Sequence, residues 1–307
     1  MNSRLLLALF AVVLVASNPS FAQERSKTRD RAPLTKQEIR TEQRRYRQAP
    51  EGDLFLHIYY PSGWKQEDAR PAIVFFFGGG WKTGSYVQLE PQAEYFASRG
   101  LVAASADYRI FNKHKTTPDQ SLQDAKSALR WIRMNARGLG VDENKIVAAG
   151  GSAGGHLAAA AALLEGFNAP DDDVTISCKP NALVLFNPAL NLTLLPGRAL
   201  IDSKGHNITK SFSPTLNLHK SAPPAVIFYG TADKFLPQGE EYAAKANGLG
   251  VRADLYTAAG MSHGFFNRSP WTEVTARKAD EFLASLGYLE GSPTIELPVK
   301  APQLEKR

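Results

Sequence analysis

One stretch of this chain, residues 145–158, constrains the fold more than any other. Four apolar, β-prone residues lead into Gly150-Gly151-Ser152-Ala153-Gly154, and a run of helix-forming residues follows directly. A strand, a sharp turn and a helix in this order are the context in which Gly-x-Ser-x-Gly presents a nucleophilic serine. Gly150 and Gly154 allow a close approach of strand and helix, because glycine has no Cβ atom. Read alone, the motif also fits a glycine-rich turn that happens to hold a serine, so the rest of the chain must decide.

Apolar runs alternate with helical patterns along most of the remaining sequence. The expected strands are runs of apolar, β-prone residues at 54–60, 72–77, 101–106, 146–149, 182–186, 225–229 and 253–256. The expected helices lie at 89–99, at 119–136, directly after Ser152, at 237–247 and at 273–286. This alternation predicts an α/β fold with a mostly parallel central sheet and helices on both faces. We expect one domain over residues 51–289, with a short cap-like insertion at about 189–222.

The first 22 residues have the pattern of a cleavable secretory signal. Arg4 supplies the positive start, residues 5–16 form a short apolar segment, and Ser20-Phe21-Ala22 forms a small-x-small cleavage site. An apolar segment of this length is too short to cross a bilayer, and no later run is long enough. The sequence therefore predicts a secreted or periplasmic protein without an integral membrane segment.

The positive charge of the chain is concentrated next to this signal. The formal net charge is +6, and residues 23–50 hold nine Lys/Arg against four Asp/Glu. The rest of the mature chain is therefore neutral, which argues against a nucleic-acid groove within the fold. We expect residues 23–50 to be a basic N-terminal arm, with a short helix capped by Thr35 and Glu38, and residues 290–307 to be a tail. Tethering of the arm to a surface or to a polyanion is the alternative to a solvated leader.

The residues that directly follow the expected strands are the candidates for the functional site, because ligands bind beyond the carboxyl ends of parallel strands. The residues in these positions are Gly78 to Trp81, Asp107-Tyr108-Arg109, Ser152, Asn187-Pro188, Asp233 and His263. A serine hydroxyl needs a neighbouring base, most often histidine, and that base needs a carboxylate to orient it. His263 lies on a glycine-flanked loop, and Asp233 directly follows a buried strand. The predicted catalytic set is Ser152, Asp233 and His263.

The three glycines before Trp81 complete this set. Without side chains, consecutive backbone N–H groups of the Gly78-Gly79-Gly80 loop can turn towards the oxyanion of a tetrahedral intermediate. The amide after the nucleophile is the usual second donor. The predicted oxyanion hole therefore consists of the amides of Gly79, Gly80 and Ala153.

Five segments together resemble a known family. They are Phe77-Gly78-Gly79-Gly80-Trp81, Asp107-Tyr108-Arg109, residues 150–158, Gly230-Thr231-Ala232-Asp233 and His263-Gly264-Phe265. Over residues 54–287 the chain is similar to α/β-hydrolase-fold carboxylesterases, of the group typified by hormone-sensitive lipase and acetyl xylan esterase. One position departs from the pattern. Phe77 stands where the family usually has a histidine that braces the oxyanion loop.

The resemblance implies hydrolysis of a carboxylic ester through a serine acyl-enzyme, with no metal and no cofactor. We expect a short acyl ester of acetyl or feruloyl type, on a small molecule or a polysaccharide. Trp81 and Tyr108 are the candidates for stacking on the substrate, and packing at the sheet edge is the alternative for both. A serine peptidase of the prolyl-oligopeptidase type shares the fold, but it usually carries a large N-terminal propeller. A non-catalytic binding protein on the same fold is the other alternative, and its best support is Phe77. The oligomeric state is left open.

Overall fold

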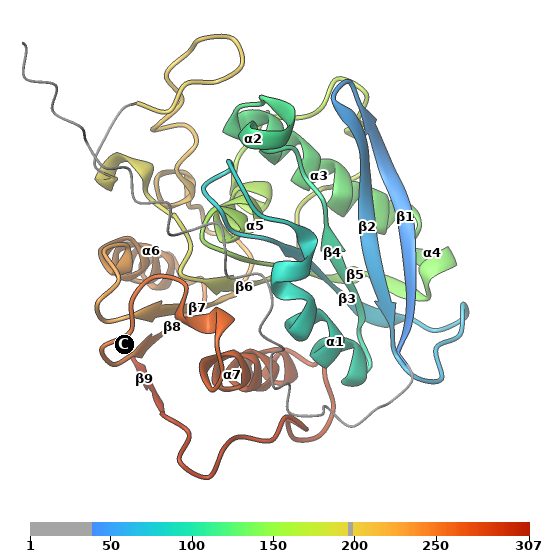
Figure 1. The fold of residues 1–307 in the computed structure, drawn as a ribbon, viewed down its shortest axis with the longest axis vertical. Coiled ribbons are helices and arrows are strands. Elements are labelled where there is room, and N and C mark those ends of the chain that lie inside the picture. Colours follow the sequence, from blue (N-terminus) through green and yellow to red (C-terminus); the bar gives the residue numbers. More distant parts are fainter. Residues whose placement is uncertain (1–38, 196–198) are drawn as a thin grey trace, which may run out of the picture. The chain divides into compact units, whose positions relative to one another are not determined.

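A single sheet organises the part of the chain that the computed structural model describes, residues 39–195 and 199–307. Its strands follow the order β1-β2-β4-β3-β5-β6-β7-β8-β9 (Figure 1). The strand bounds are β1 Arg40–Ala49, β2 Gly52–Tyr60, β3 Arg70–Phe76, β4 Val102–Ala106, β5 Val141–Gly151, β6 Ala182–Phe186, β7 Ala225–Gly230, β8 Ala253–Ala258 and β9 Leu304–Lys306. The six central strands from β4 to β8 pair in parallel, whereas β1–β2, β2–β4 and β8–β9 are antiparallel.

Helices cover both faces of this sheet. α1 (Glu90–Ser98) and α7 (Trp271–Ser285) pack on one face, and α3 (Pro118–Met134), α5 (Ala153–Leu163) and α6 (Leu236–Gly248) pack on the other (Figure 1). The remaining helices are short, namely α2 Phe111–His114, α4 Ala136–Leu139, η1 Tyr86–Leu89, η2 Leu192–Leu194, η3 Pro214–Asn217 and η4 Phe265–Asn267. None of the described helices combines the length and the apolar character needed to cross a membrane.

Strand β3 shows why the central strands are uninterrupted apolar runs. Val74 and Phe76 lie in the core beneath α3 and α5, and the alternating residues Ile73 and Phe75 lie in the core beneath α1 and α7. Successive side chains of a strand point to opposite faces, so a strand covered on both faces needs apolar residues at every position. The expected α/β fold is confirmed, and each strand and helix expected between residues 54 and 287 is present, with ends that differ by a few residues.

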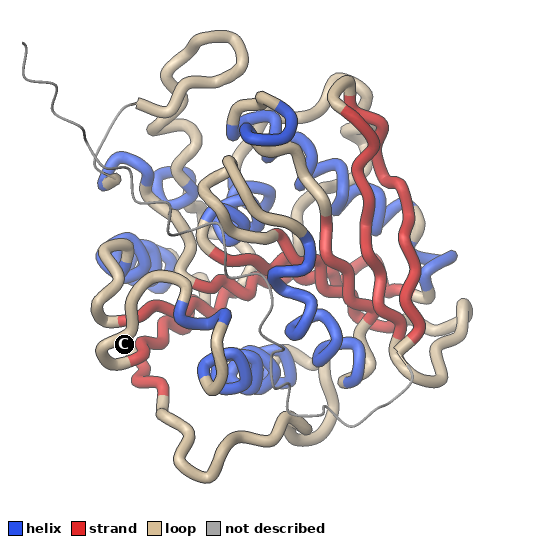
Figure 2. The backbone as a smooth tube through the Cα atoms, viewed as in Figure 1, coloured by secondary structure: helices blue, strands red, loops and turns tan. Residues whose placement is uncertain are grey.

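The segment between β6 and β7 is irregular, as expected for residues 189–222. In its described parts it holds only the two short helices η2 and η3 and one isolated bridge between Ile201 and Asn207 (Figure 2). Ser203 ties this segment to the start of α3, because its hydroxyl donates to Asp119 at 2.7 Å.

The expectation for residues 40–49 is wrong. This part of the basic arm is neither a helix nor a leader outside the fold, but the edge strand β1, which pairs with β2 along its whole length. A bulge between Arg45 and Arg47 turns two consecutive side chains, Tyr46 and Arg47, towards the core. The expected signal of residues 1–22 and the first part of the arm lie outside the described residues.

Buried charges hold β1 in the fold. The guanidinium of Arg47 donates to Asp124 of α3 at 3.1 Å, and Asp124 also accepts from Arg109 at 2.8 Å. All three side chains are at most 5% exposed. Part of the positive charge of this segment is therefore neutralised by ion pairs inside the domain.

The expected tail is also partly wrong. Leu304–Lys306 forms β9, which adds an antiparallel strand to the edge of β8, and Lys306 pairs with Asp254 at 2.8 Å. The predicted domain limits at residues 51 and 289 therefore leave out a strand at each edge of the sheet.

Candidate active site

Ser152 lies at the tip of the turn between β5 and α5. Its backbone has φ +52° and ψ −115°, a strained conformation for a residue other than glycine. Its N–H donates to Phe186 O at the end of β6 (2.9 Å). A Cβ atom on Gly150 would lie 2.7 Å from Phe76 O and would also overlap the backbone of Gly154. The two glycines of the motif are therefore required by the close approach of helix and strand.

The structure brings the three predicted catalytic side chains together. His263 Nε2 lies 2.8 Å from Ser152 Oγ, and His263 Nδ1 lies 2.8 Å from Asp233 Oδ2. A carboxylate can only accept, so Nδ1 carries the proton and the lone pair of Nε2 faces the serine hydroxyl. The Asp233 side chain is 1% exposed, and its other oxygen accepts the N–H of Phe235 at 2.9 Å. The imidazole is held in the tautomer that can take a proton from Ser152.

Asn187 is a further polar residue at this site, for which the sequence suggested no role. It directly follows β6, is fully buried and has φ +37°. Its Oδ1 accepts the N–H of Gly264 at 3.1 Å, which places its Nδ2 3.4 Å from His263 Nε2. Asn187 therefore anchors the loop that carries the histidine. The only signal in the sequence was its place after a buried strand.

The predicted oxyanion donors lie at the same edge of the sheet as Ser152. A Cβ atom on Gly78 would lie 3.3 Å from Ser152 Cβ, so the glycine loop runs directly against the serine. Gly79 and Gly80 have φ +136° and +63°, values that favour glycine. Within the described residues, the amides of Gly79, Gly80 and Ala153 donate no hydrogen bond to another protein group. They are free to bind a negatively charged oxygen.

The two predicted substrate contacts differ. Tyr108 is 2% exposed, its ring lies 4.0 Å from that of Phe77, and its hydroxyl donates to Phe77 O at 2.6 Å. The prediction that Tyr108 stacks on a substrate is therefore wrong, because the ring is already covered. Trp81 is half-buried, and its ring meets the edge of His156 at a centroid distance of 5.0 Å. Stacking of a substrate on Trp81 stays a prediction.

His156, one helical turn after the nucleophile, is structural. It is fully buried, and its Nε2 donates to Phe212 O at 2.7 Å. Burial lowers the pKa of His156 to about 4. The imidazole is therefore neutral at physiological pH and supplies no charge to the site.

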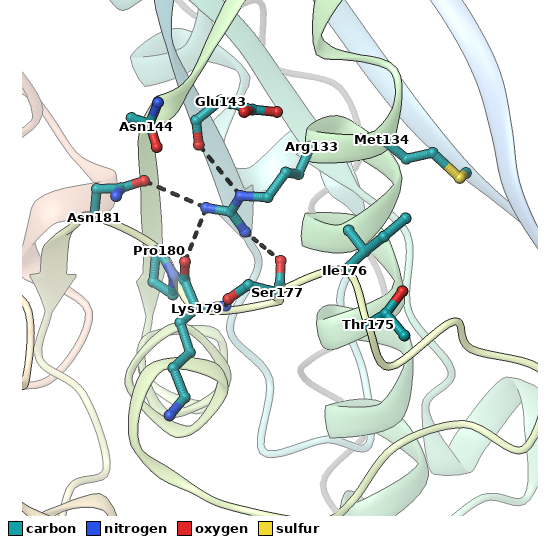
Figure 3. Close-up of a pocket in the computed structure, with 10 residues that line it drawn as sticks. All are labelled: Arg133, Met134, Glu143, Asn144, Thr175, Ile176, Ser177, Lys179, Pro180 and Asn181. Carbon is teal, nitrogen blue, oxygen red and sulfur yellow. Dashed lines mark hydrogen bonds between the residues drawn. The ribbon is translucent and has the colours of Figure 1, made fainter.

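A groove of about 640 Å³ lies at the opposite edge of the sheet, where β5 and β6 begin (Figure 3). The guanidinium of Arg133 donates there to the carbonyls of Glu143, Ser177 and Lys179 and to the side chain of Asn181. These contacts join the end of α3 to the segments that precede the two strands. The groove holds none of the predicted catalytic residues.

Comparisons with known proteins identify the family of this chain. A family profile described as BD-FAE matches residues 56–245. Carboxylesterase NlhH of Mycobacterium tuberculosis (strain CDC 1551 / Oshkosh) is 26% identical over 305 residues, which cover 92% of this chain and 93% of that protein. The structure of Thermogutta terrifontis esterase 2 phosphonylated by cyclosarin is 43% identical with a TM-score of 0.77, covering 82% of this chain and 96% of that chain.

A second solved structure, described as a thermophilic esterase from the Planctomycetes species Thermogutta terrifontis with propionate bound, is 42% identical with a TM-score of 0.77. The match covers 82% of this chain and 96% of that chain. These similarities extend over nearly all of the described domain and come from esterases, which removes the peptidase and binding-protein alternatives. The chain therefore belongs to the BD-FAE family, within the α/β-hydrolase-fold serine carboxylesterases of the hormone-sensitive-lipase-like group, and it is a carboxylic ester hydrolase.

Proposed function

We propose that Ser152 is the nucleophile of this esterase, His263 its general base and acid, and Asp233 the carboxylate that orients the histidine. The observation that carries this proposal is the continuous hydrogen-bonded chain from Asp233 Oδ2 through the imidazole to Ser152 Oγ, with both distances at 2.8 Å. A serine so placed can lose its proton as it attacks a carbonyl carbon.

The reaction then follows in two half-reactions. Ser152 Oγ adds to the ester carbonyl carbon while His263 Nε2 takes the proton of the hydroxyl. The resulting oxyanion accepts hydrogen bonds from the amides of Gly79, Gly80 and Ala153. Collapse of the tetrahedral intermediate breaks the C–O bond, and the alcohol leaves with the proton from Nε2. A water molecule then attacks the acyl-enzyme with the same proton transfers and releases the carboxylic acid. A single donor to the oxyanion is worth about 3 kcal/mol of transition-state stabilisation.

The substrate in this proposal is a short-chain ester of acetyl or feruloyl type, on a small molecule or a polysaccharide. The propionate bound to the Thermogutta terrifontis esterase supports a small acyl group. Trp81, which follows the glycine loop, and His156, in the first turn after Ser152, both pack against Phe212, so aromatic rings already occupy space beside the nucleophile. Trp81 is the candidate for a contact with a ring of the substrate.

The decisive experiment compares hydrolysis of p-nitrophenyl acetate, butyrate and octanoate and of methyl ferulate by the wild type and Ser152→Ala. We expect the rate to fall with acyl length and to drop at least ~10³-fold in the variant. Ser221→Ala is the matched control, because Ser221 Oγ lies 3.0 Å from His219 Nδ1 in an exposed pair to which no described carboxylate is hydrogen-bonded. Full activity of Ser152→Ala would refute the nucleophile, and a preference for octanoate would refute the short acyl group.

The proposed enzyme is secreted or periplasmic. The support is the charge and apolar pattern of residues 1–22 in the sequence. Expression of the full chain and of a form lacking residues 2–22 in a bacterial host tests it. Esterase activity should appear outside the cytoplasm only for the full chain, and equal cytoplasmic activity of both forms would contradict export.

A further inference from the structure

The peptide unit that joins Phe77 to Gly78 is held at both of its polar ends. Tyr108 Oη donates to Phe77 O at 2.6 Å, and Gly78 N donates to Gln88 Oε1 at 2.5 Å. The carbonyl and the N–H belong to one planar trans group and point in opposite directions. Two hydrogen bonds on opposite sides therefore fix the orientation of the whole plane.

The two side chains that hold this plane are themselves fixed. Tyr108 follows β4, is 2% exposed and stacks on the Phe77 ring with an interplanar angle of 15°. Burial raises the pKa of Tyr108, so its hydroxyl keeps the proton that it donates. Gln88 is half-buried and lies in η1, which is tied to β4 by a hydrogen bond of 2.8 Å from Ser105 Oγ to Tyr86 O. Both contacts thus transmit the rigidity of β4 to the loop.

The glycines that follow need such a restraint. Gly79 and Gly80 carry no side chain that could lock their backbone, and both are exposed and lie in the positive-φ region. Glycine visits more backbone conformations than any other residue, so the direction of these amides is not set by their own sequence. The Gly78 amide is already engaged by Gln88 and points away from any oxyanion role. The held plane is the last rigid unit before the Gly79 amide. The next peptide plane, which carries the Gly80 amide, is held at Gly79 O by the N–H groups of Lys82 and Thr83, both at 3.1 Å.

We infer that Tyr108 and Gln88 are positioning residues that clamp the Phe77–Gly78 peptide and thereby aim the Gly79 amide, and with it the turn that carries the Gly80 amide, at the oxyanion. This inference rests on the proposed function, because it concerns the same glycine loop. It also assigns a role to Tyr108 other than substrate contact. Preorganised donors act mainly on the transition state, so loosening them lowers kcat more than it changes KM.

The test uses Tyr108→Phe, which removes only the hydroxyl and keeps the stack on Phe77, and Gln88→Met, which removes the acceptor at nearly constant size. We expect each variant to lose roughly 10- to 100-fold in kcat for p-nitrophenyl acetate, with KM within about twofold of the wild type. Gln88→Glu keeps an acceptor oxygen for Gly78 and should recover most of the activity. Inhibition by a trifluoromethyl ketone, which forms a tetrahedral adduct, should weaken by a factor similar to the loss in kcat.

Tyr95→Phe is the matched control for the loss of a buried tyrosine hydroxyl. Tyr95 is 1% exposed and donates to Asp280 at 2.5 Å in the contact between α1 and α7, and it has no hydrogen bond to the glycine loop within the described residues. It should lower thermal stability without changing kcat. Equal kcat and equal inhibitor affinity in Tyr108→Phe, Gln88→Met and the wild type would overturn the inference. Ser152→Ala is measured beside them to separate failure of the clamp from failure of the proposed function. Full activity of Ser152→Ala would refute the proposed function itself. An inactive Ser152→Ala together with wild-type kcat in Tyr108→Phe and Gln88→Met would refute only the clamp.

Discussion

Acid should destabilise this protein through one buried histidine. His156 of α5 is fully buried, with Nε2 donating to Phe212 O and with no hydrogen-bond partner for Nδ1 among the described residues. Burial lowers its pKa to about 4, against about 6.5 for an unperturbed histidine. Between these two values the unfolded chain binds a proton that the folded protein does not, so the free energy of unfolding falls as the pH falls.

The size of the effect follows from the difference between the two pKa values. A difference of one pKa unit corresponds to about 1.4 kcal/mol, so His156 should remove about 3 kcal/mol between pH 7 and pH 4. The loss begins near pH 6.5 and levels off below pH 4, where both states carry the proton. Since native proteins are stable by about 5–15 kcal/mol, this single group accounts for a large share of the total free energy of unfolding.

The measurement is urea unfolding of the wild type and His156→Gln at several pH values from 7 to 4. Glutamine keeps an N–H group for Phe212 O but cannot be protonated, and all other ionisable groups are shared. The difference in unfolding free energy between the two proteins should therefore change by about 3 kcal/mol across this range, with the wild type losing more. Parallel pH curves for the two proteins would refute the reasoning, as would a folded-state titration of His156 near pH 6.5 by NMR.

Three further predictions follow from the contacts. Asp233→Asn should lower kcat roughly 10³- to 10⁴-fold with little change in circular dichroism, because the amide favours the wrong tautomer of the imidazole; a loss below tenfold would contradict its role. Asn187→Ala should lower kcat about tenfold by releasing the Gly264 amide, whereas Asn187→Asp, which retains the acceptor, should keep that loop ordered by hydrogen exchange. Asp124→Asn should reduce the unfolding free energy by about 3–5 kcal/mol, since two buried arginines lose their shared carboxylate, and an unchanged urea midpoint would count against this.

The strands and helices of the central domain could be predicted because their signals are local. A strand covered on both faces is a run of apolar residues, as in β3, and each such run can be recognised without knowledge of its neighbours. β1 lacks that signal, since its sequence RTEQRRYRQA is mostly polar. It is a strand because β2 pairs with it and because Arg47 reaches Asp124, 77 residues away. A local sequence pattern does not reveal such contacts between residues that lie far apart in the chain.

The same distinction applies to the candidate site. Ser152, Asp233 and His263 each follow a strand of a parallel sheet, and the carboxyl ends of such strands meet at one edge, so their proximity could be expected. The direction of a side chain at that edge depends on its packing. Tyr108 turns inward because Phe77 offers it a ring and a carbonyl, and neither contact is visible in the motif.

The two edge strands also affect how the molecule behaves at high concentration. An open sheet edge presents unpaired N–H and C=O groups and can template aggregation with a second molecule. β1 carries exposed side chains at Arg40, Arg44 and Arg45, so the antiparallel approach of two such edges would bring like charges together. At the other edge, β9 is only three residues long and includes the exposed Glu305 and Lys306. Both edge strands of this sheet, whose central strands are buried apolar runs, are thus poor templates for growth into fibrils.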